Sequence, residues 1–287
     1  MIFNESYTLN NGVTIPKIGL GTWMIENDDA AQAVRDAVVV GYRHFDTAEG
    51  YGNEKGVGEG IRSCGVARNE LFVTTKIEAD YKTYDEAKAG IEGSLRDLDI
   101  DYIDLVIIHA PQPWAEFRGE NPYYAENLQV WKALEESHEA GAIRAIGVSN
   151  FAVADLANLL ENGTVKPAVN QVLAHISNTP FDVLDYCKEN DILVEAYSPM
   201  GHGEILSNPV IIEMAQQYGV SVAQLCIRYC LELGMLPLPK TGNPDHMRSN
   251  ADVSFEIAVE DMEILRNITP IKNYGEHSQF PVYSEQV

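Results

Sequence analysis

The chain has 287 residues, of which 45% are hydrophobic, and its 43 acidic and 20 basic side chains give a formal net charge of −23. This apolar content is enough for a large buried core. A surface so acidic repels nucleic-acid phosphates and anionic lipid, so we expect neither nucleic acid nor a membrane as a partner.

The first element expected is a β-hairpin over residues 7–16, because Asn11-Gly12 at its centre suits the positive φ angles of a tight turn. The N-terminal residues lack the basic start and apolar run of a signal peptide. Nowhere does an apolar run approach the roughly 20 residues of a membrane helix. These features predict a cytosolic protein.

After the hairpin, short apolar runs alternate with longer segments whose apolar residues recur at helical spacing. The expected strands are 17–22, 42–46, 71–76, 104–110, 143–149, 168–173, 192–198 and 235–240. The clearest helices are 28–41, 83–99 and 124–141, and further helical patterns start at Asp182, Ser207 and Ser221.

Eight strand–helix units without a dividing linker predict one α/β domain over residues 1–287, folded as a closed (β/α)₈ TIM barrel. The alternative, an open doubly wound sheet, would carry GxGxxG at the first strand–helix turn. That turn reads GLGTWM (19–24) and supplies only GxG, and GVGEG (56–60) follows no strand directly.

The four cysteines form no CxxC pair, and most lie in apolar helical patterns. Cys226 and Cys230 share a helix face but have no His or Cys partner nearby. We expect buried reduced thiols and no metal site.

Polar residues mark three successive strand ends. Asp46 ends the second strand, Lys76 the third and His109 the fourth, while Tyr51 lies in the loop behind Asp46. Barrel enzymes perform their chemistry at the C-terminal ends of the strands, so these side chains are expected to converge.

The residue types suit proton donation to a carbonyl oxygen. A phenol with a pKa of about 10 is a weak acid at neutral pH. A neighbouring lysine lowers that pKa, and an aspartate keeps the lysine charged. Taken singly, however, Asp46 could cap a helix, Lys76 could be a solvated rim residue and His109 could be structural. Both interpretations stay open at this point.

Further motifs give the chain a resemblance to the aldo-keto reductases from about residue 7 to residue 255. DTAEGYGNE (46–54) resembles the DTAxxYxNE motif of that family, and DLVIIHAPQP (104–113) is similar to its HWPxP segment. The other matching blocks, in the family's order, are VTTKI, IRAIGVSNF, VNQV, VEAYSPMGHG and LPKTGNP. Within that family, the chain resembles the bacterial diketogluconate and aldehyde reductases. The resemblance implies a barrel whose bottom is plugged by the hairpin, and NAD(P)H-dependent reduction of aldehydes and ketones.

The resemblance also implies roles for particular residues. Tyr51 would be the general acid, tuned by Lys76 and Asp46, and His109 would orient the carbonyl. The cofactor, expected to be NADPH, would contact Gly21, Thr22, Trp23, Ser149, Asn150, Gln171, Tyr197, Ser198, Lys240, Thr241, His246 and Asn250. In that set Ser149, Asn150 and Gln171 would hold the nicotinamide carboxamide, and Tyr197 would stack beneath the ring. The substrate pocket would comprise Trp23, Tyr51, His109, Ala110 and Trp114.

Three positions depart from the family pattern. Ala110 replaces the tryptophan of HWP, which removes a bulky wall of the substrate pocket. Leu173 replaces a glutamate. His246 stands where an arginine normally grips the 2′-phosphate of the cofactor, so NADH is expected to be tolerated beside NADPH.

Competing hypotheses use the same residues differently. Lys76 could form a Schiff base in a lyase, although Asp46 would keep it protonated. The barrel could also be a non-catalytic, nucleotide-sensing subunit, and a hydrolytic metal at His44 and His109 lacks a third ligand. We expect a monomer that takes small aldehydes, dicarbonyls or keto-sugar acids. Residues 112–123 and the tail 270–287 would lie near the barrel mouth and set specificity.

Overall fold

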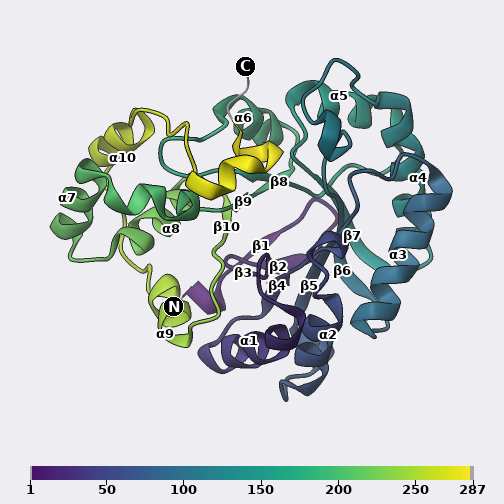
Figure 1. Cartoon of the computed structure of the whole chain (residues 1–287), viewed down its shortest axis with the longest axis horizontal. Helices are drawn as coiled ribbons and strands as arrows, with labels where there is room; N and C mark the ends of the chain where they lie inside the picture. The colour runs from purple at the N-terminus through teal and green to yellow at the C-terminus, as the bar shows by residue number, and fades with distance from the viewer. Residues whose placement is uncertain (1, 285–287) are drawn as a thin grey trace.

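A computed structural model describes residues 2–284 of the chain. Its main feature is an eight-stranded sheet in which every paired neighbour is parallel (Figure 1). The strands are β3 (Leu20–Gly21), β4 (His44–Asp46), β5 (Phe72–Ile77), β6 (Ile103–Ile108), β7 (Ile143–Ser149), β8 (Val169–Leu173), β9 (Leu193–Tyr197) and β10 (Leu236–Leu238). The predicted (β/α)₈ barrel is confirmed.

Backbone contacts between the first and last strands close the barrel. The Gly21 N–H donates to the Pro239 carbonyl over 3.1 Å, and Gly21 forms a parallel bridge with Lys240. A Cβ at position 21 would lie 3.3 Å from the Leu238 carbonyl oxygen, so a side chain would strain this close approach. Glycine here keeps the seam tight.

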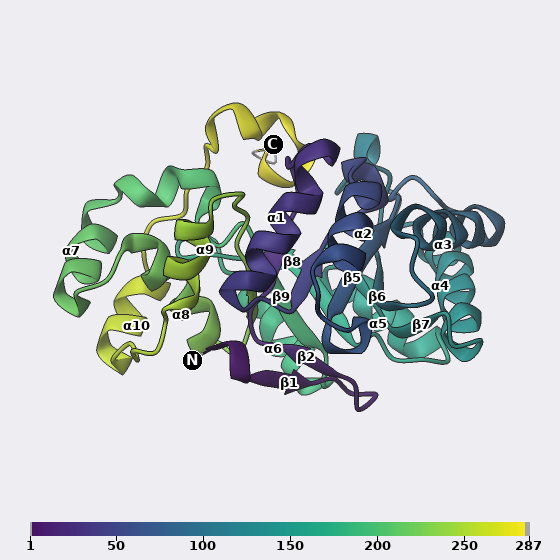
Figure 2. The same cartoon turned by 90° about the horizontal axis from the view of Figure 1, so that it is seen from below.

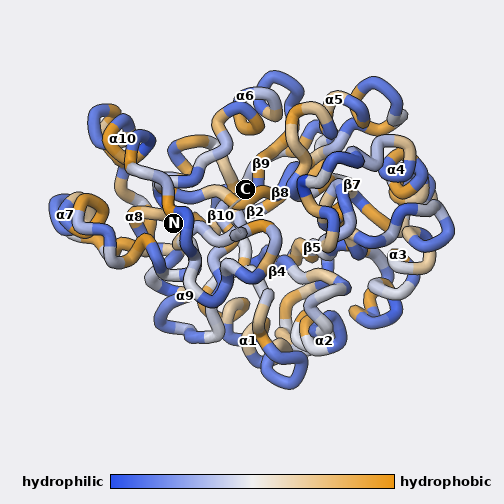
Figure 3. Tube along the Cα trace, turned by 45° about the horizontal axis from the view of Figure 1, so that its top comes forward, coloured by the Kyte–Doolittle hydropathy of each residue, from blue (hydrophilic) through white to orange (hydrophobic). Residues whose placement is uncertain are grey.

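Helices surround the barrel, and in Figure 3 their hydrophilic residues lie mainly on the outer side. They are α1 (Asn27–Val40), α2 (Glu54–Ser63), α3 (Tyr84–Leu98), α4 (Tyr124–Glu139), α5 (Val153–Asn162), α6 (Phe181–Glu189), α7 (Pro209–Tyr218), α8 (Val222–Glu232), α9 (Pro244–Ala251) and α10 (Val259–Arg266). The three clearest predicted helices match α1, α3 and α4 to within two residues at each end.

Two of the predicted helix starts differ from those in the structure. Ser221 does cap α8, accepting a hydrogen bond from the Gln224 N–H. Asn208 rather than Ser207 caps α7, because Pro209 suits the first helical position and the Asn208 side chain accepts from the next two N–H groups. Asp182 lies inside the first turn of α6, where its charge favours the helix dipole.

The hairpin forms from β1 (Ser6–Thr8) and β2 (Thr14–Pro16), but its turn differs from the prediction. Leu9 pairs with Val13 through the backbone, so three residues connect the strands. Only Gly12 has a positive φ, of 85°. Asn11 instead donates its side-chain amide to the Arg144 carbonyl, which ties the turn to the barrel.

The hairpin covers the end of the barrel where the strands begin (Figure 2). Tyr7 donates to the Met235 carbonyl just before β10, and Asn10 donates to the Pro167 carbonyl just before β8. Ile15 packs with apolar residues from inside the barrel. The opposite end, where the strands finish, is therefore the one that can hold a site.

Asp104 on β6 makes a testable contribution to stability. Its side chain is fully buried and accepts hydrogen bonds from Arg68 and Arg144, each over 2.6 Å, and from the Val73 N–H. We expect Asp104→Asn to lower the free energy of unfolding by about 2–3 kcal/mol, because two guanidinium groups lose their counter-charge.

Urea denaturation followed by circular dichroism measures this loss. Asp245→Asn is the matched control, since its ion pair with Arg248 is exposed and contributes roughly 0.5 kcal/mol or less. Equal losses in the two variants would contradict the role given to Asp104.

No helix among residues 2–284 combines the length and apolar character needed to cross a bilayer. The four cysteines carry free thiols, and Cys187, Cys226 and Cys230 are buried while Cys64 is partly exposed. Burial raises the pKa of Cys187 to about 11, so this thiol stays protonated.

Candidate active site

A cavity of about 960 Å³ opens at the end of the barrel where the strands finish. Its wall includes Asp46, Tyr51 and His109, and it also includes Lys240 and His246. The predicted convergence of polar residues from separate strands therefore occurs at a single cavity.

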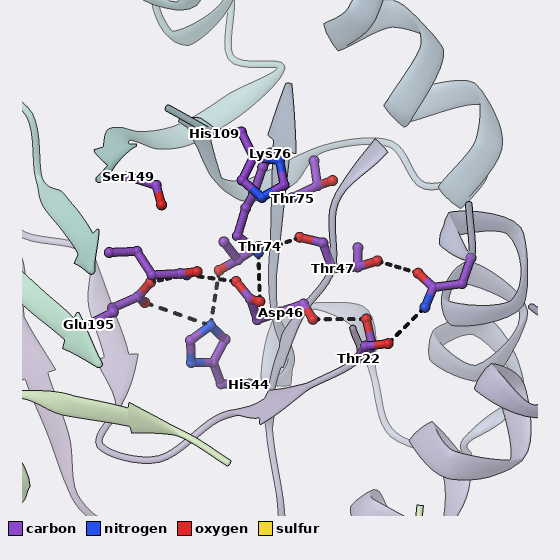
Figure 4. A network of polar contacts seen from close by, with 12 residues as sticks. Thr22, His44, Asp46, Thr47, Thr74, Thr75, Lys76, His109, Ser149 and Glu195 are labelled. Atoms are coloured by element: carbon purple, nitrogen blue, oxygen red, sulfur yellow. Dashed lines mark hydrogen bonds and ion pairs between the residues drawn. The ribbon is translucent and has the colours of Figure 1, made fainter. Parts of the chain in front are cut away.

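A buried ion pair lies at the base of this cavity (Figure 4). The Lys76 ammonium donates to Asp46 Oδ2 over 2.7 Å and to the Thr47 carbonyl over 2.8 Å, and only 1% of Lys76 is exposed. Burial lowers the pKa of Lys76, but Asp46 and Tyr51 outweigh it and leave the pKa raised. Lys76 is thus a fixed cation and no solvated rim residue.

Tyr51 ends the 3₁₀ turn Glu49–Tyr51, directly behind β4. The Lys76 ammonium lies 4.8 Å from the centre of its ring, and the ring centres of Tyr51 and His109 are 5.7 Å apart. Burial raises the pKa of the phenol, and the charge and hydrogen bond of Lys76 oppose that rise. The expectation of a net lowered pKa was wrong, because burial exceeds the effect of the lysine. The phenol is therefore protonated at neutral pH.

His109 follows β6 and faces the same cavity. Burial, assisted by the charge of Lys76, lowers its pKa well below the usual value, so the imidazole is neutral near pH 7. Its ring meets Trp114 edge-on at 5.1 Å between ring centres. A neutral imidazole can offer one N–H to a ligand oxygen.

Gln171 on β8 connects the ion pair to a carboxyl group that the sequence reasoning missed. Its amide nitrogen donates to Asp46 Oδ1 and to Glu195 Oε2, each over 2.8 Å. Glu195 on β9 is fully buried, and burial raises its pKa to about 8. Strand alternation in ILVEAYS was the available signal, because it places Glu195 on the same face of β9 as Tyr197, which lines the cavity.

His44 completes this buried layer. Its Nε2 lies 2.9 Å from Thr74 Oγ1 and 4.0 Å from Glu195 Oε1. Burial lowers the pKa of His44 to about 3, so it is neutral. No group of three or more His, Cys, Asp or Glu within residues 2–284 is arranged to hold a metal ion.

Ser149, Asn150, Gln171 and Tyr197, which the resemblance assigns to the nicotinamide, all line the cavity. Their role in binding stays a prediction. The Asn150 amide is already engaged inside the protein. It donates to Ser149 Oγ and to the His109 carbonyl, each over 3.0 Å, and it accepts from the Tyr197 hydroxyl over 2.7 Å. Asn150 thus links the His109 backbone to Tyr197, the residue expected to stack beneath the nicotinamide ring.

The other expected cofactor residues divide into two groups. Those that line the cavity are Gly21, Trp23, Ser198, Lys240, His246 and Asn250. Thr22 and Thr241 do not line it. The Thr22 hydroxyl is turned into the protein and donates to the Asp46 carbonyl, while Thr241 Oγ1 accepts from the Asn243 N–H.

Of the expected substrate residues, Ala110 does not reach the cavity. Its side chain is fully buried, whereas Trp114 lines the cavity. Trp23, Tyr51, His109 and Trp114 face the cavity together. Trp114, four residues after Ala110, thus supplies an aromatic side chain to the cavity wall.

The C-terminal tail covers the mouth with two 3₁₀ turns, Gly275–Gln279 and Pro281–Tyr283, drawn in yellow in Figure 1. The Tyr283 hydroxyl lies 2.8 Å from Ser198 Oγ, and its ring stacks on Trp23 at 6.1 Å between ring centres. The predicted tail extends to residue 287, and residues 285–287 lie outside the described part of the chain.

Sequence reasoning missed further residues of the cavity wall. They are Met24, Gly50, Glu78, Pro199, Met200, His202, Gly203, Leu206, Ser221, Val222, Ala223, Leu238 and Ser249. The wall also contains His277, Phe280, Pro281, Val282 and Tyr283, which belong to the tail that was expected near the mouth. Most come from loops and helix ends, where no periodic pattern marks the residues that face inward.

The fold and the polar cluster at its mouth place the protein among the barrel enzymes. The family model "Aldo/keto reductase family" matches residues 17–270. Glyoxal reductase of Bacillus subtilis is 41% identical, with 90% of this chain and 91% of that relative covered. Glycerol 2-dehydrogenase (NADP(+)) of Saccharomyces cerevisiae is 35% identical, with 92% and 91% covered.

Solved structures agree with this assignment. The aldo-keto reductase of Bombyx mori, solved in complex with NADP, superposes with a TM-score of 0.86 at 31% identity, covering 98% of this chain and 99% of that one. The chain belongs to the aldo/keto reductase family and is an oxidoreductase.

Proposed function

We propose that the protein reduces the carbonyl group of small aldehydes or ketones with NADPH, and that Tyr51 is the proton donor. The observation that carries this proposal is the Asp46–Lys76 ion pair beside the Tyr51 ring at the base of the cavity. Two relatives, a glyoxal reductase and a glycerol 2-dehydrogenase (NADP(+)), support the same chemistry by their names.

The cavity wall suits a nicotinamide nucleotide. Because the Gln171 amide nitrogen is committed to two carboxyl groups, its oxygen is the atom left to accept from a carboxamide. Tyr197 offers an aromatic wall, and Lys240 in the same wall supplies a cation for a phosphate of the nucleotide. When bound, the nucleotide supplies the hydride.

Side chains of the protein then orient the substrate carbonyl and donate the proton. His109, neutral and facing the cavity, donates a hydrogen bond to the carbonyl oxygen and aligns it. Tyr51 transfers its proton to that oxygen as negative charge develops there. Lys76 stabilises the phenolate that forms, and Asp46 holds Lys76 in place.

Absorbance at 340 nm during incubation with NADPH and a panel of aldehydes, dicarbonyls and ketones tests the function. We expect oxidation of NADPH that depends on the carbonyl compound and yields one alcohol for each NADPH. A nucleotide-sensing subunit would bind NADPH without turnover. A lyase would give a borohydride-trapped adduct at Lys76, which we do not expect from a lysine whose pKa is raised.

Cofactor choice provides a prediction for the part of the cavity wall that contains Lys240 and His246. His246 is exposed on α9 and lines the cavity, whereas Arg248 is ion-paired with Asp245 over 2.6 Å and is not part of the wall. Lys240 is then the fixed cation available to a 2′-phosphate. We expect kcat/KM for NADPH and NADH to agree within about tenfold, since an imidazole lacks the bidentate grip of arginine.

His246→Arg should raise the preference for NADPH by about tenfold, and Arg248→Ala should leave it unchanged. Steady-state kinetics with both cofactors measures the ratios. A preference of the unmodified protein for NADPH above about a hundredfold, roughly 3 kcal/mol, would contradict this explanation.

The monomeric state, the single-domain boundaries and the cytosolic location stay predictions. Light scattering of the purified chain tests the first of them.

A further inference from the structure

A carboxylate in the cavity wall has no part in the mechanism above. Glu78 follows β5 directly, two residues after Lys76, and lines the same cavity as Tyr51. A Cβ built at Gly50 would lie 2.6 Å from Glu78 Oε1, so the carboxylate packs directly against the residue that precedes Tyr51. Glu78 is therefore a neighbour of the reacting end of the cavity.

The negative charge of Glu78 is not neutralised nearby. The other charged residues of the described wall are Asp46, which is paired with Lys76, and Lys240, which is not among the charges that act on Glu78. No salt bridge within residues 2–284 involves Glu78, and its carboxylate accepts a hydrogen bond from the Ala79 backbone. The charges that act on it, from Glu49 and Asp80, are negative too.

The charge of Glu78 acts on Tyr51, the proposed proton donor. It contributes to the raised pKa of Tyr51, although burial is the main cause there and other groups also act. In a cavity lined by protein, a charge interacts with a ligand more strongly than it would in open water. Any substrate held between Tyr51 and His109 lies in the same field.

We propose that Glu78 selects substrates by charge, disfavouring carbonyl compounds that carry a carboxylate and favouring neutral or cationic ones. This inference rests on the proposed function and narrows it to aldehydes and dicarbonyls, in place of the keto-sugar acids expected earlier. Rejection of an anion by a fixed like charge is a direct way to exclude a competing substrate. The Lys76 cation does not offset it, because its charge is balanced by Asp46.

The selection has a defined pH dependence. Burial, followed by the charges of Glu49 and Asp80, raises the pKa of Glu78. The groups facing it are these two acids and the phenols of Tyr51 and Tyr81, whose own pKa values are raised. Discrimination against anions is therefore weak below the pKa of Glu78 and reaches its full extent above it.

The test compares three benzaldehydes that differ at the para position: a carboxylate, its methyl ester and a trimethylammonium group. Dividing each kcat/KM of Glu78→Gln by that of the unmodified protein cancels the intrinsic reactivity of the aldehydes. We expect this quotient to be about tenfold higher for the carboxylate than for the ester, and severalfold lower for the cation. Glu78→Leu, which also removes the charge, should give the same order.

Asp80→Asn is the matched control, because Asp80 lies two residues further on, is exposed and does not line the cavity. At a pH above the pKa of Glu78, its quotients should stay equal for all three aldehydes. Two results would overturn the inference. In one, the quotients of both Glu78 variants change equally for all three aldehydes. In the other, the preference of the unmodified protein for the ester over the carboxylate does not change with pH. If the unmodified protein reduces none of the aldehydes or of the wider panel, the proposed function itself fails, and this inference with it.

Discussion

Replacing Tyr51 by phenylalanine is expected to lower kcat by about 1,000-fold, because the substituted ring fills the same space but has no proton to donate. The affinity for NADPH should stay within about twofold, since no contact proposed for the cofactor uses this hydroxyl. Steady-state turnover of a small aldehyde, together with a fluorescence titration of NADPH, measures both quantities.

Tyr229→Phe is the control for loss of a tyrosine hydroxyl. Tyr229 is fully buried, its hydroxyl lies 2.9 Å from Thr179 Oγ1, and it does not line the cavity. This variant should turn over at near the unmodified rate. If Tyr51→Phe did the same, another group would have to be the proton donor.

Replacing Lys76 by methionine is expected to lower kcat by about 100-fold or more. Lys76 is the group that opposes the upward shift of the Tyr51 pKa by burial. Without it the phenol becomes a still weaker acid, and the phenolate formed during turnover loses its neighbouring cation. The measurement is kcat at several pH values, with circular dichroism to confirm the fold.

Lys82→Met controls for the removal of a partly buried ammonium. Lys82 donates to the Pro111 carbonyl and to Asn127, each over 3.1 Å, and it lies outside the cavity wall. Its removal should change stability but leave kcat within a few-fold. Folded Lys76→Met with unreduced kcat would contradict the tuning role.

The sequence predicted the fold and the core of the site for one physical reason. Parallel strands of a barrel bring their C-terminal ends to one edge, so residues at successive strand ends must meet. Asp46, Lys76 and His109 follow this rule, and the structure brings them together around one cavity. Their roles in catalysis stay predictions, as does that of Tyr51.

The balance of pKa values could not be predicted in the same way. The rule that a lysine lowers the pKa of a phenol is correct for Lys76 and Tyr51, but burial acts in the opposite direction and is larger. Burial depends on the packing of distant segments around the mouth, and periodicity says nothing about its amount. Glu195 and Gln171 illustrate the same limit, because their hydrogen bonds depend on the pairing of β8 with β9.

Loops and the tail were the least predictable parts. Tyr283 reaches Ser198 across 85 positions of sequence, and no local pattern in the tail indicates this contact. Glu78 directly follows the lysine strand, but its place beside Gly50 depends on how two neighbouring loops pack. At the hairpin, the Asn11-Gly12 motif predicted the element correctly and the turn wrongly. Asn11 does not adopt a positive φ, and its side-chain amide donates to the Arg144 carbonyl of the barrel.

The central claim is direct hydride transfer to a carbonyl in this cavity. The bound nicotinamide ring is expected to present only one of its two faces to that carbonyl. The most direct measurement uses two NADPH samples, each deuterated on one side of nicotinamide C4, and determines the deuterium in the alcohol by mass spectrometry. We predict one deuterium on the carbinol carbon from one sample and none from the other. Alcohol without deuterium from either sample, or with deuterium from both, would contradict the account.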